Sequence, residues 1–182
     1  MRLIFVDTET TGLSPRDGHR IVEIACVEMI EGQLTGREFH HLVNPQRPVP
    51  PVAVGIHGID DAMLQCKPTF AEMSAQLIDF VADGKAVMHH APFDTAFFAD
   101  EFKRIGAEFS PLVRREEIID TLPLFRARYP GARCSLEALC SRHGLAPAAS
   151  EGWHGALTDA RMLARLWLAA GMRGSTGADP LL

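Results

Sequence analysis

The sequence is poor in the features that mark membrane and secreted proteins. No apolar run is long enough to span a bilayer, and Asp7 interrupts the first one almost at once, which argues against a signal peptide. Only four of the 182 residues are cysteines, and they are scattered, so we expect reduced thiols. Cys134, Cys140 and His143 do not have the spacing of common zinc sites. These absences predict a cytoplasmic protein without a membrane partner.

The chain also lacks an excess of basic residues. It has 18 Lys and Arg against 23 Asp and Glu, a formal net charge of −5. A protein that held nucleic acid by counterion release alone would be basic. If nucleic acid is its substrate, we therefore expect weak local binding or a partner that holds the protein there. The acidic excess also suits a protein that gathers carboxylates around a cation.

Internal repeats and low-complexity tracts are absent as well, and short apolar runs alternate with helical patterns. The patterns predict loops at 8–19 and 44–51 and strands at 3–6, 21–30, 34–43, 85–89 and 117–119. They predict helices at 69–82, 92–105, 121–128, 135–143 and 156–170. This order is typical of an α/β domain with a mixed sheet over residues 1–170. A disordered tail is expected at 171–182.

Asp7 and Glu9 form the first candidate site. They lie two residues apart at the end of the predicted strand 3–6, and alternate residues of a strand point the same way. Two such carboxylates repel each other, so a cation should compensate them. Taken alone, the pair is better explained by Asp7 capping a loop and Glu9 facing solvent.

Three more candidates lie near the starts of later helices. Asp94 falls in the first turn of helix 92–105, where it would either stabilise the helix dipole or supply a third carboxylate. Asp159 lies near the start of helix 156–170, off its apolar stripe. His154 precedes that helix on a glycine-containing loop. It is either a surface histidine or a general base close to the carboxylates.

Oxygen ligands of this kind suit a hard cation such as Mg²⁺ or Mn²⁺. Two such ions can hold a scissile phosphodiester, one activating water and the other stabilising the leaving oxygen. Phosphoryl transfer depends mainly on positioning and charge neutralisation. A few carboxylates and one base are therefore sufficient for it.

Three ordered motifs resemble the DEDD superfamily of exonucleases; they span residues 5–13, 89–94 and 154–160. The third resembles the DEDDh subclass, in which a histidine precedes the last aspartate by five residues. Intervening stretches resemble the epsilon proofreading subunits of bacterial DNA polymerase III; these are residues 20–24, 55–59, 67–70, 120–122 and 135–140. The resemblance covers roughly residues 1–170.

The resemblance implies a ribonuclease H-like fold and two divalent ions, Mg²⁺ or Mn²⁺. It implies that Asp7, Glu9 and Asp159 bind these ions and that Asp94 binds directly or through water. It implies His154 as the base that deprotonates the attacking water, with nucleoside 5′-monophosphates as products. The pocket for the 3′-terminal nucleotide would be lined by Thr10, Gly12, Leu13, His57 and Phe93.

The implied partners are a single-stranded or frayed DNA 3′ end and the polymerase III alpha subunit. Two departures from the family pattern matter. His90 stands where the second motif usually has Asn, and we expect a changed substrate contact with the chemistry intact. The chain also stops soon after its last predicted helix, so it is either truncated before a polymerase-binding segment or a stand-alone relative. Residues 178–182 loosely resemble a sliding-clamp-binding peptide, but a tail without function is the favoured interpretation.

Other functions stay open at this stage. An RNA-trimming exonuclease of the same superfamily would use the same chemistry, and the 2′-hydroxyl would separate the two substrates. A non-catalytic module that only stabilises a polymerase would not need the motif residues. An α/β protein whose carboxylates are scattered caps would bind no metal.

Overall fold

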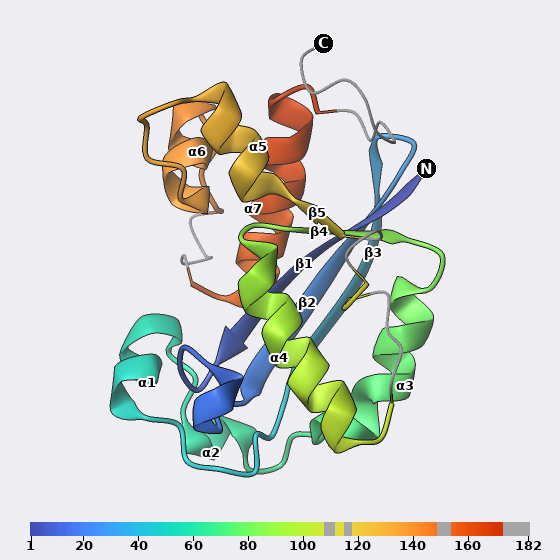
Figure 1. Ribbon diagram of the computed structural model, residues 1–182, viewed down its shortest axis with the longest axis vertical. Coiled ribbons are helices and arrows are strands. Elements are labelled where there is room, and N and C mark those ends of the chain that lie inside the picture. Colours follow the sequence, from blue (N-terminus) through green and yellow to red (C-terminus); the bar gives the residue numbers. More distant parts are fainter. Residues whose placement is uncertain (108–111, 115–117, 149–153, 173–182) are drawn as a thin grey trace.

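The computed structural model describes residues 1–107, 112–114, 118–148 and 154–172. One sheet with helices on both faces makes up this part of the chain (Figure 1). Its strands are β1 (Arg2–Thr10), β2 (Ile21–Ile30), β3 (Gln33–Leu42), β4 (Lys85–Met88) and β5 (Ile118–Asp120). The predicted α/β domain with a mixed five-stranded sheet is confirmed.

The strands are ordered β3-β2-β1-β4-β5. The first three form an antiparallel meander, whereas β4 and β5 run parallel to β1. β1 therefore lies in the middle of the sheet, and its carboxyl end lies at the same edge as those of β4, its parallel neighbour, and of β5 beyond β4. That edge is where ligands bind in many open sheets.

The described helices are α1 (Pro51–His57), α2 (Asp61–Leu64), α3 (Phe70–Val81), α4 (Ala91–Arg104), α5 (Thr121–Arg128), α6 (Leu136–Arg142) and α7 (Ala156–Ala169), with a 3-10 turn η1 (Pro15–Asp17). α3 begins at the predicted capping box, because the amide of Thr69 donates to the Glu72 carboxylate at 2.7 Å. The later predicted helices match within one or two residues. No described helix is long and apolar enough to cross a membrane.

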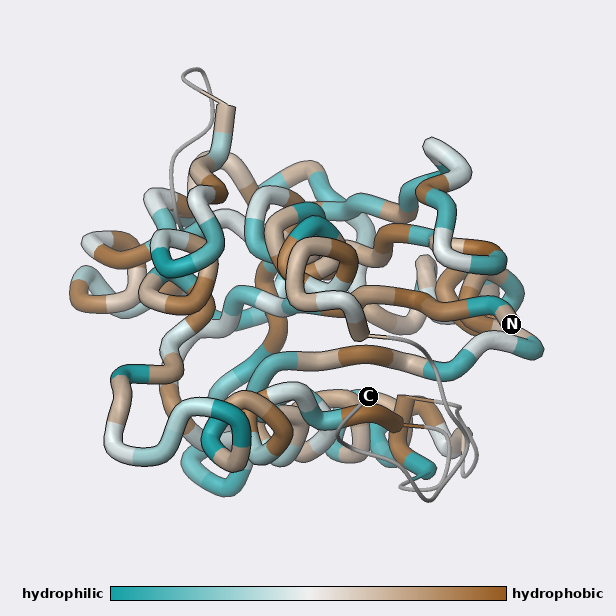
Figure 2. Tube along the Cα trace, turned by 90° about the horizontal axis from the view of Figure 1, so that it is seen from above, coloured by the Kyte–Doolittle hydropathy of each residue, from teal (hydrophilic) through white to brown (hydrophobic). Residues whose placement is uncertain are grey.

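The two faces of the sheet bury different helices. On one face, Ile4 and Val6 of β1 pack with aromatic residues of α3 and α4, among them Phe70, Phe97 and Phe98. α7 covers the other face, and α5 and α6 pack beside it through a small cluster of their own. Apolar segments of the sheet run through the middle of the molecule in the view from above (Figure 2).

Two local predictions were wrong. Residues 8–10 were expected to start a loop, but β1 continues to Thr10, because Thr8 and Thr10 keep pairing with β2 and threonine suits a strand. Asp7 and Glu9 therefore lie within the strand. The helices α1 and α2 were not predicted, since each is short and follows a proline or aspartate that also suits a loop.

Three expectations stay untested. The tail expected to be disordered falls largely in residues 173–182, outside the described residues, and so does the clamp-like peptide at 178–182. The domain boundary at residue 170 likewise remains a prediction.

Candidate active site

Alternate side chains of β1 point to the same face of the sheet, and its acidic side chains lie on the face that α7 covers. Leu3 and Phe5 pack on that helix, and the Phe5 ring meets Trp167 edge-on at 5.9 Å. Asp7 and Glu9 continue the same series of odd positions, so they point to the same face of the sheet. Leu3 and Phe5 therefore pack against α7, and Asp7 and Glu9 lie near the start of that helix.

Asp159 meets this series of residues from the first turn of α7. Ligand atoms of Asp7, Glu9 and Asp159 lie within 4.8 Å of one another. Ala156 and Ala160 are fully buried on either side of Asp159, and such small residues let the helix approach the strand closely. Three of the four predicted carboxylates are thus brought together by elements about 150 residues apart in sequence.

Asp94 reaches the site from the other face of the sheet. It is 4% exposed and lies in the first turn of α4. The hydroxyl of Thr8, an even position of β1, donates to its Oδ1 at 2.6 Å. Asp94 is not part of the group within 4.8 Å. Whether it binds a metal directly or through water stays a prediction.

These carboxylates strongly disfavour one another's charge. Burial, followed by the charges of Asp94, Asp159, Glu9 and Glu23, holds the pKa of Asp7 well above its usual range. Burial first, then Glu23, Asp159 and Asp94, raises the pKa of Glu9 to about 8.

Burial is also the largest cause for the other two acids, with a smaller contribution from the charge of Asp120 for Asp94 and from Glu23 and Glu137 for Asp159. Burial raises the pKa of Asp94 to about 7, against the hydrogen bond from Thr8. Burial raises the pKa of Asp159 to about 6, while the charge and backbone of His154 lower it. A cation bound among these carboxylates would favour their charged forms and lower their pKa values.

The residues fit a divalent cation. Asp159 Oδ1 is buried and has no hydrogen-bond partner among the described residues. Buried polar atoms are normally paired, so an orphaned carboxylate oxygen beside two others points to a ligand position. The donors are all oxygens, which is the set that Mg²⁺ and Mn²⁺ prefer. The chemistry of the acidic cluster therefore suggests a metal site.

We expect the metal-free protein to lose stability as the pH rises. A carboxyl group whose folded pKa is raised contributes its full stability below the unfolded value near 4, and loses it as the pH passes the folded value. Those folded values are about 6 for Asp159, about 7 for Asp94 and about 8 for Glu9. The melting temperature in EDTA should therefore fall between about pH 5 and about pH 8.5.

Saturating Mn²⁺ should flatten or reverse that slope, because the ion binds the ionised carboxylates. Scanning calorimetry at matched ionic strength would measure both curves. A melting temperature in EDTA that rises over this pH range would contradict the account of mutual repulsion.

His154 lies at the entrance to α7. It is exposed, with a left-handed backbone (φ 68°), and Gly155 separates it from the first helical residue. Its influence on the pKa of Asp159 shows that it lies near that carboxylate. An exposed imidazole beside a carboxylate cluster can exchange a proton with water.

The predicted nucleotide-pocket residues fall into two groups. Thr10, Gly12 and His57 are linked: the Thr10 hydroxyl donates to the Gly12 carbonyl at 2.7 Å, and the backbone of Thr10 acts on the pKa of His57. His57 Nδ1 accepts from the amide of Ile59, and its buried Nε2 has no well-aligned partner among the described residues.

Leu13 and Phe93 make the second group. Leu13 is 86% exposed, which is unusual for a leucine and leaves it free to touch a ligand. Phe93 is half-buried at the start of α4, where its ring lies 5.1 Å from that of Phe97. No described contact joins either side chain to the first group.

Two backbone details explain residue choices at the site. A Cβ at Gly12 would lie 2.3 Å from the His19 ring, so a larger residue would displace that ring. His90 has a left-handed backbone (φ 75°), and its amide donates to Asp120 Oδ1 at 3.0 Å. Asn and His both adopt this conformation more readily than most residues, so the exchange of the usual Asn for His preserves the turn.

Glu23 and Thr8 were not predicted from the sequence to take part in the site. Both lie in the stretches that carried the family resemblance, but neither was assigned a role. A glutamate inside a strand that is otherwise apolar was the available signal for Glu23, because a buried charge needs partners. Thr8 gave no such signal, since its contact with Asp94 crosses 86 residues.

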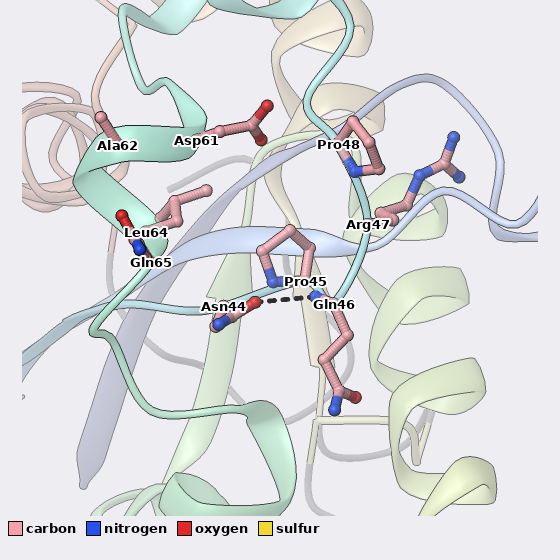
Figure 3. A pocket seen from close by; sticks show the side chains of 9 residues that line it. All are labelled: Asn44, Pro45, Gln46, Arg47, Pro48, Asp61, Ala62, Leu64 and Gln65. Carbon is pink, nitrogen blue, oxygen red and sulfur yellow. Dashed lines mark hydrogen bonds between the residues drawn. The ribbon is translucent and has the colours of Figure 1, made fainter.

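Two other places in the molecule are separate from this cluster. A cavity of about 630 Å³ lies between α2 and residues 44–48, and it contains none of the predicted site residues (Figure 3). In the wall formed by residues 44–48, the amide of Gln46 donates to Asn44 Oδ1 at 2.9 Å. Cys134 and Cys140 are buried free thiols, and among the described residues only the carboxylate cluster groups potential metal ligands.

Comparison with known proteins identifies the family. Residues 4–167 match the RNase T family, described as exonucleases. The chain belongs to this family. It is 42% identical over 168 residues to the DNA polymerase III subunit epsilon of Rickettsia felis, across 92% of this chain and 73% of the relative. It is therefore a 3′→5′ exonuclease of the DEDD type, homologous to epsilon subunits, as the motifs predicted.

Solved structures agree on the fold. Exonuclease X in complex with 5′ overhanging duplex DNA superposes with a TM-score of 0.71 at 31% identity, covering 96% of this chain and 94% of that chain. The nuclease domain of 3′hExo, a DEDDh family member bound to rAMP, gives a TM-score of 0.79 at 17% identity, over 95% of this chain and 92% of that chain. The second likeness shows the fold alone. The expected ribonuclease H-like fold is confirmed.

Proposed function

We propose that this exonuclease removes nucleotides from DNA 3′ ends as the proofreading partner of a replicative polymerase. The observation that carries the chemistry is the group of three carboxylates within 4.8 Å, with His154 at the start of the helix that bears one of them. The DNA substrate is supported by the homology to epsilon subunits and by the likeness to Exonuclease X, whose structure contains duplex DNA.

Each acidic residue has a role in this proposal. Asp7, Glu9 and Asp159 would hold two divalent ions, Mg²⁺ or Mn²⁺, and Asp94 would bind directly or through water. When bound, such ions lower the pKa of a coordinated water and neutralise charge on the scissile phosphate. His154 would take the proton from the attacking water at a ring nitrogen and pass it to solvent, which its exposed position allows. A nucleoside 5′-monophosphate is then released.

The residues of the predicted nucleotide pocket would position the substrate. Thr10 ends β1, and Gly12 and Leu13 follow it directly, so the three residues can line the pocket for the terminal nucleotide. The Nε2 of His57 has no well-aligned partner among the described residues, and it can act as a donor to a phosphate or a hydroxyl because Nδ1 already accepts a bond. Phe93 offers a half-buried ring face for a base to stack on.

The charge of the chain suggests how it meets DNA. At a net charge of −5 it has little general attraction for a polyanion. A polymerase alpha subunit, with or without a sliding clamp, would supply the local concentration that the exonuclease lacks. This proposal places the protein in the cytoplasm with its DNA.

Digestion of end-labelled oligonucleotides tests the proposal. With Mg²⁺ or Mn²⁺, a 3′-labelled single-stranded DNA should lose its label at once as a mononucleotide, and a 5′-labelled one should give a ladder that shortens stepwise. EDTA should stop both reactions. A matched RNA oligonucleotide serves as the control for the sugar, and faster trimming of RNA would replace the DNA proposal with an RNA-trimming one.

A further inference from the structure

Glu23 is a buried charge at the rear of the candidate site. It lies on β2 among apolar neighbours and is 6% exposed. Both of its carboxylate oxygens have partners. The amide of Ala156 donates to Oε2 at 2.9 Å, and His40 Nε2 donates to Oε1 at 2.6 Å. Because both oxygens are engaged, Glu23 is poorly placed to become another metal ligand.

The bond to Ala156 serves the start of α7. The N-cap of this helix is Gly155, which has no side chain to accept from the first turn. The first amides of a helix have no partner within it, and they prefer a negative charge close by. Glu23 supplies both the acceptor and the charge from a strand 133 residues away in sequence.

The start of α7 in turn sets the positions of two proposed site residues. Asp159 lies in the first turn, and its amide donates to the Gly155 carbonyl at 3.0 Å. His154 immediately precedes Gly155. On the other side, Glu23 is the cross-strand partner of Glu9. Glu23 therefore links both halves of the site: its strand position pairs with Glu9 of β1, and its carboxylate accepts from the start of α7, which carries Asp159.

This arrangement carries an electrostatic cost. The charge of Glu23 adds to the crowding of Glu9, Asp7 and Asp159. A glutamine would form the same bond to the helix without that repulsion, and an apolar residue would pack in the strand more simply.

We propose that Glu23 is a positioning residue: with His40 behind it, it fixes the start of α7 so that Asp159 and His154 face Asp7 and Glu9. This inference rests on the roles proposed above for Asp159 and His154. Glu23 does not touch the reacting atoms, and its effect on turnover passes through the helix.

Kinetics of Glu23 variants test the inference, with Glu28 as a matched control. Glu28 lies on the same strand, is 1% exposed, and pairs with Arg2, Arg37 and Thr35 away from the site. At saturating Mn²⁺, Glu23→Ala should lower kcat on a DNA oligonucleotide by about 10- to 100-fold with KM nearly unchanged, as is common for residues that orient ligands. Glu23→Gln, which keeps an acceptor for the Ala156 amide, should recover most of that loss. Glu28→Ala should lower the melting temperature and leave kcat unchanged below it.

The outcomes separate the two proposals. Inactive wild type in Mn²⁺ would reject the proposed function. Active wild type with Glu23→Ala within twofold of its kcat would reject only the role of Glu23, and so would an equal fall of kcat in Glu28→Ala. If Glu23→Ala does not fold, His40→Ala is measured instead. The His40 side chain is 39% exposed, so its loss should disturb the fold less. His40→Ala should lower kcat about threefold or more with KM unchanged, and an unaltered kcat would overturn the inference.

Discussion

Replacing Asp7 with asparagine should abolish nuclease activity and, in the absence of metal, make the protein more stable. Asp7 is half-buried beside Glu9 and Asp159, and its pKa is held well above the usual range by desolvation and by its acidic neighbours. Asparagine has nearly the same shape and no charge. Removing one charge relieves the repulsion, and it also removes a ligand whose charge a cation requires. Sites that store such repulsion commonly trade stability for activity.

The two effects should be large and opposite. A metal ion supplies several kcal/mol of transition-state stabilisation, so kcat/KM should fall by about 1,000-fold or more. The melting temperature in EDTA should rise by about 2–6 °C. Mn²⁺ should no longer stabilise the variant as it stabilises the wild type.

A second Asp→Asn change provides the control. Asp100 pairs with Arg104 on the surface of α4, and Asp100→Asn should leave activity unchanged and the melting temperature nearly so. Calorimetry and oligonucleotide digestion would give both quantities for each variant. Equal activities of Asp7→Asn and wild type would remove the basis for the assigned site, and a lower metal-free melting temperature would contradict the repulsion.

Replacing His154 with alanine should separate catalysis from metal binding. The imidazole is exposed and precedes α7, whereas the three clustered carboxylates come from β1 and α7. Mn²⁺ affinity should therefore stay within a few-fold of wild type, while turnover falls by about 100- to 10,000-fold, the usual contribution of a general base. Titration calorimetry with Mn²⁺ and digestion of labelled DNA would measure the two effects separately.

A histidine far from the cluster controls for loss of an imidazole as such. His143 lies 3.0 Å from the Tyr129 hydroxyl at the end of α6, and His143→Ala should leave turnover intact. Loss of Mn²⁺ affinity in His154→Ala would mean that the imidazole is a ligand. Full activity in that variant would mean that another group accepts the proton.

The parts of this protein that sequence predicted are those with a local pattern. The hairpins β1–β2 and β2–β3 and the later helices follow from alternation, turns and caps, and the capping box at Thr69 marked the start of α3 within one residue. Asp7, Glu9 and Asp159 were predicted from motifs, and the structure brings them together.

What sequence did not predict depends on contacts between distant residues. Glu23 reaches Ala156 across 133 residues and Thr8 reaches Asp94 across 86, and no local pattern reports such a pairing. The extension of β1 to Thr10 has the same origin, because the pairing with β2 outweighs the loop-like composition of residues 8–19.

The division of the cluster between the first strand and the last described helix has a consequence during synthesis. Asp7 and Glu9 are made early, but Asp159 and His154 emerge only when nearly the whole described chain has been translated, and they reach the site only when α7 docks. With the roles proposed for Asp159 and His154, a nascent or partly unfolded chain has an incomplete ligand set and no base. We therefore expect that the chain cannot degrade a 3′ end before its last helix packs onto the sheet.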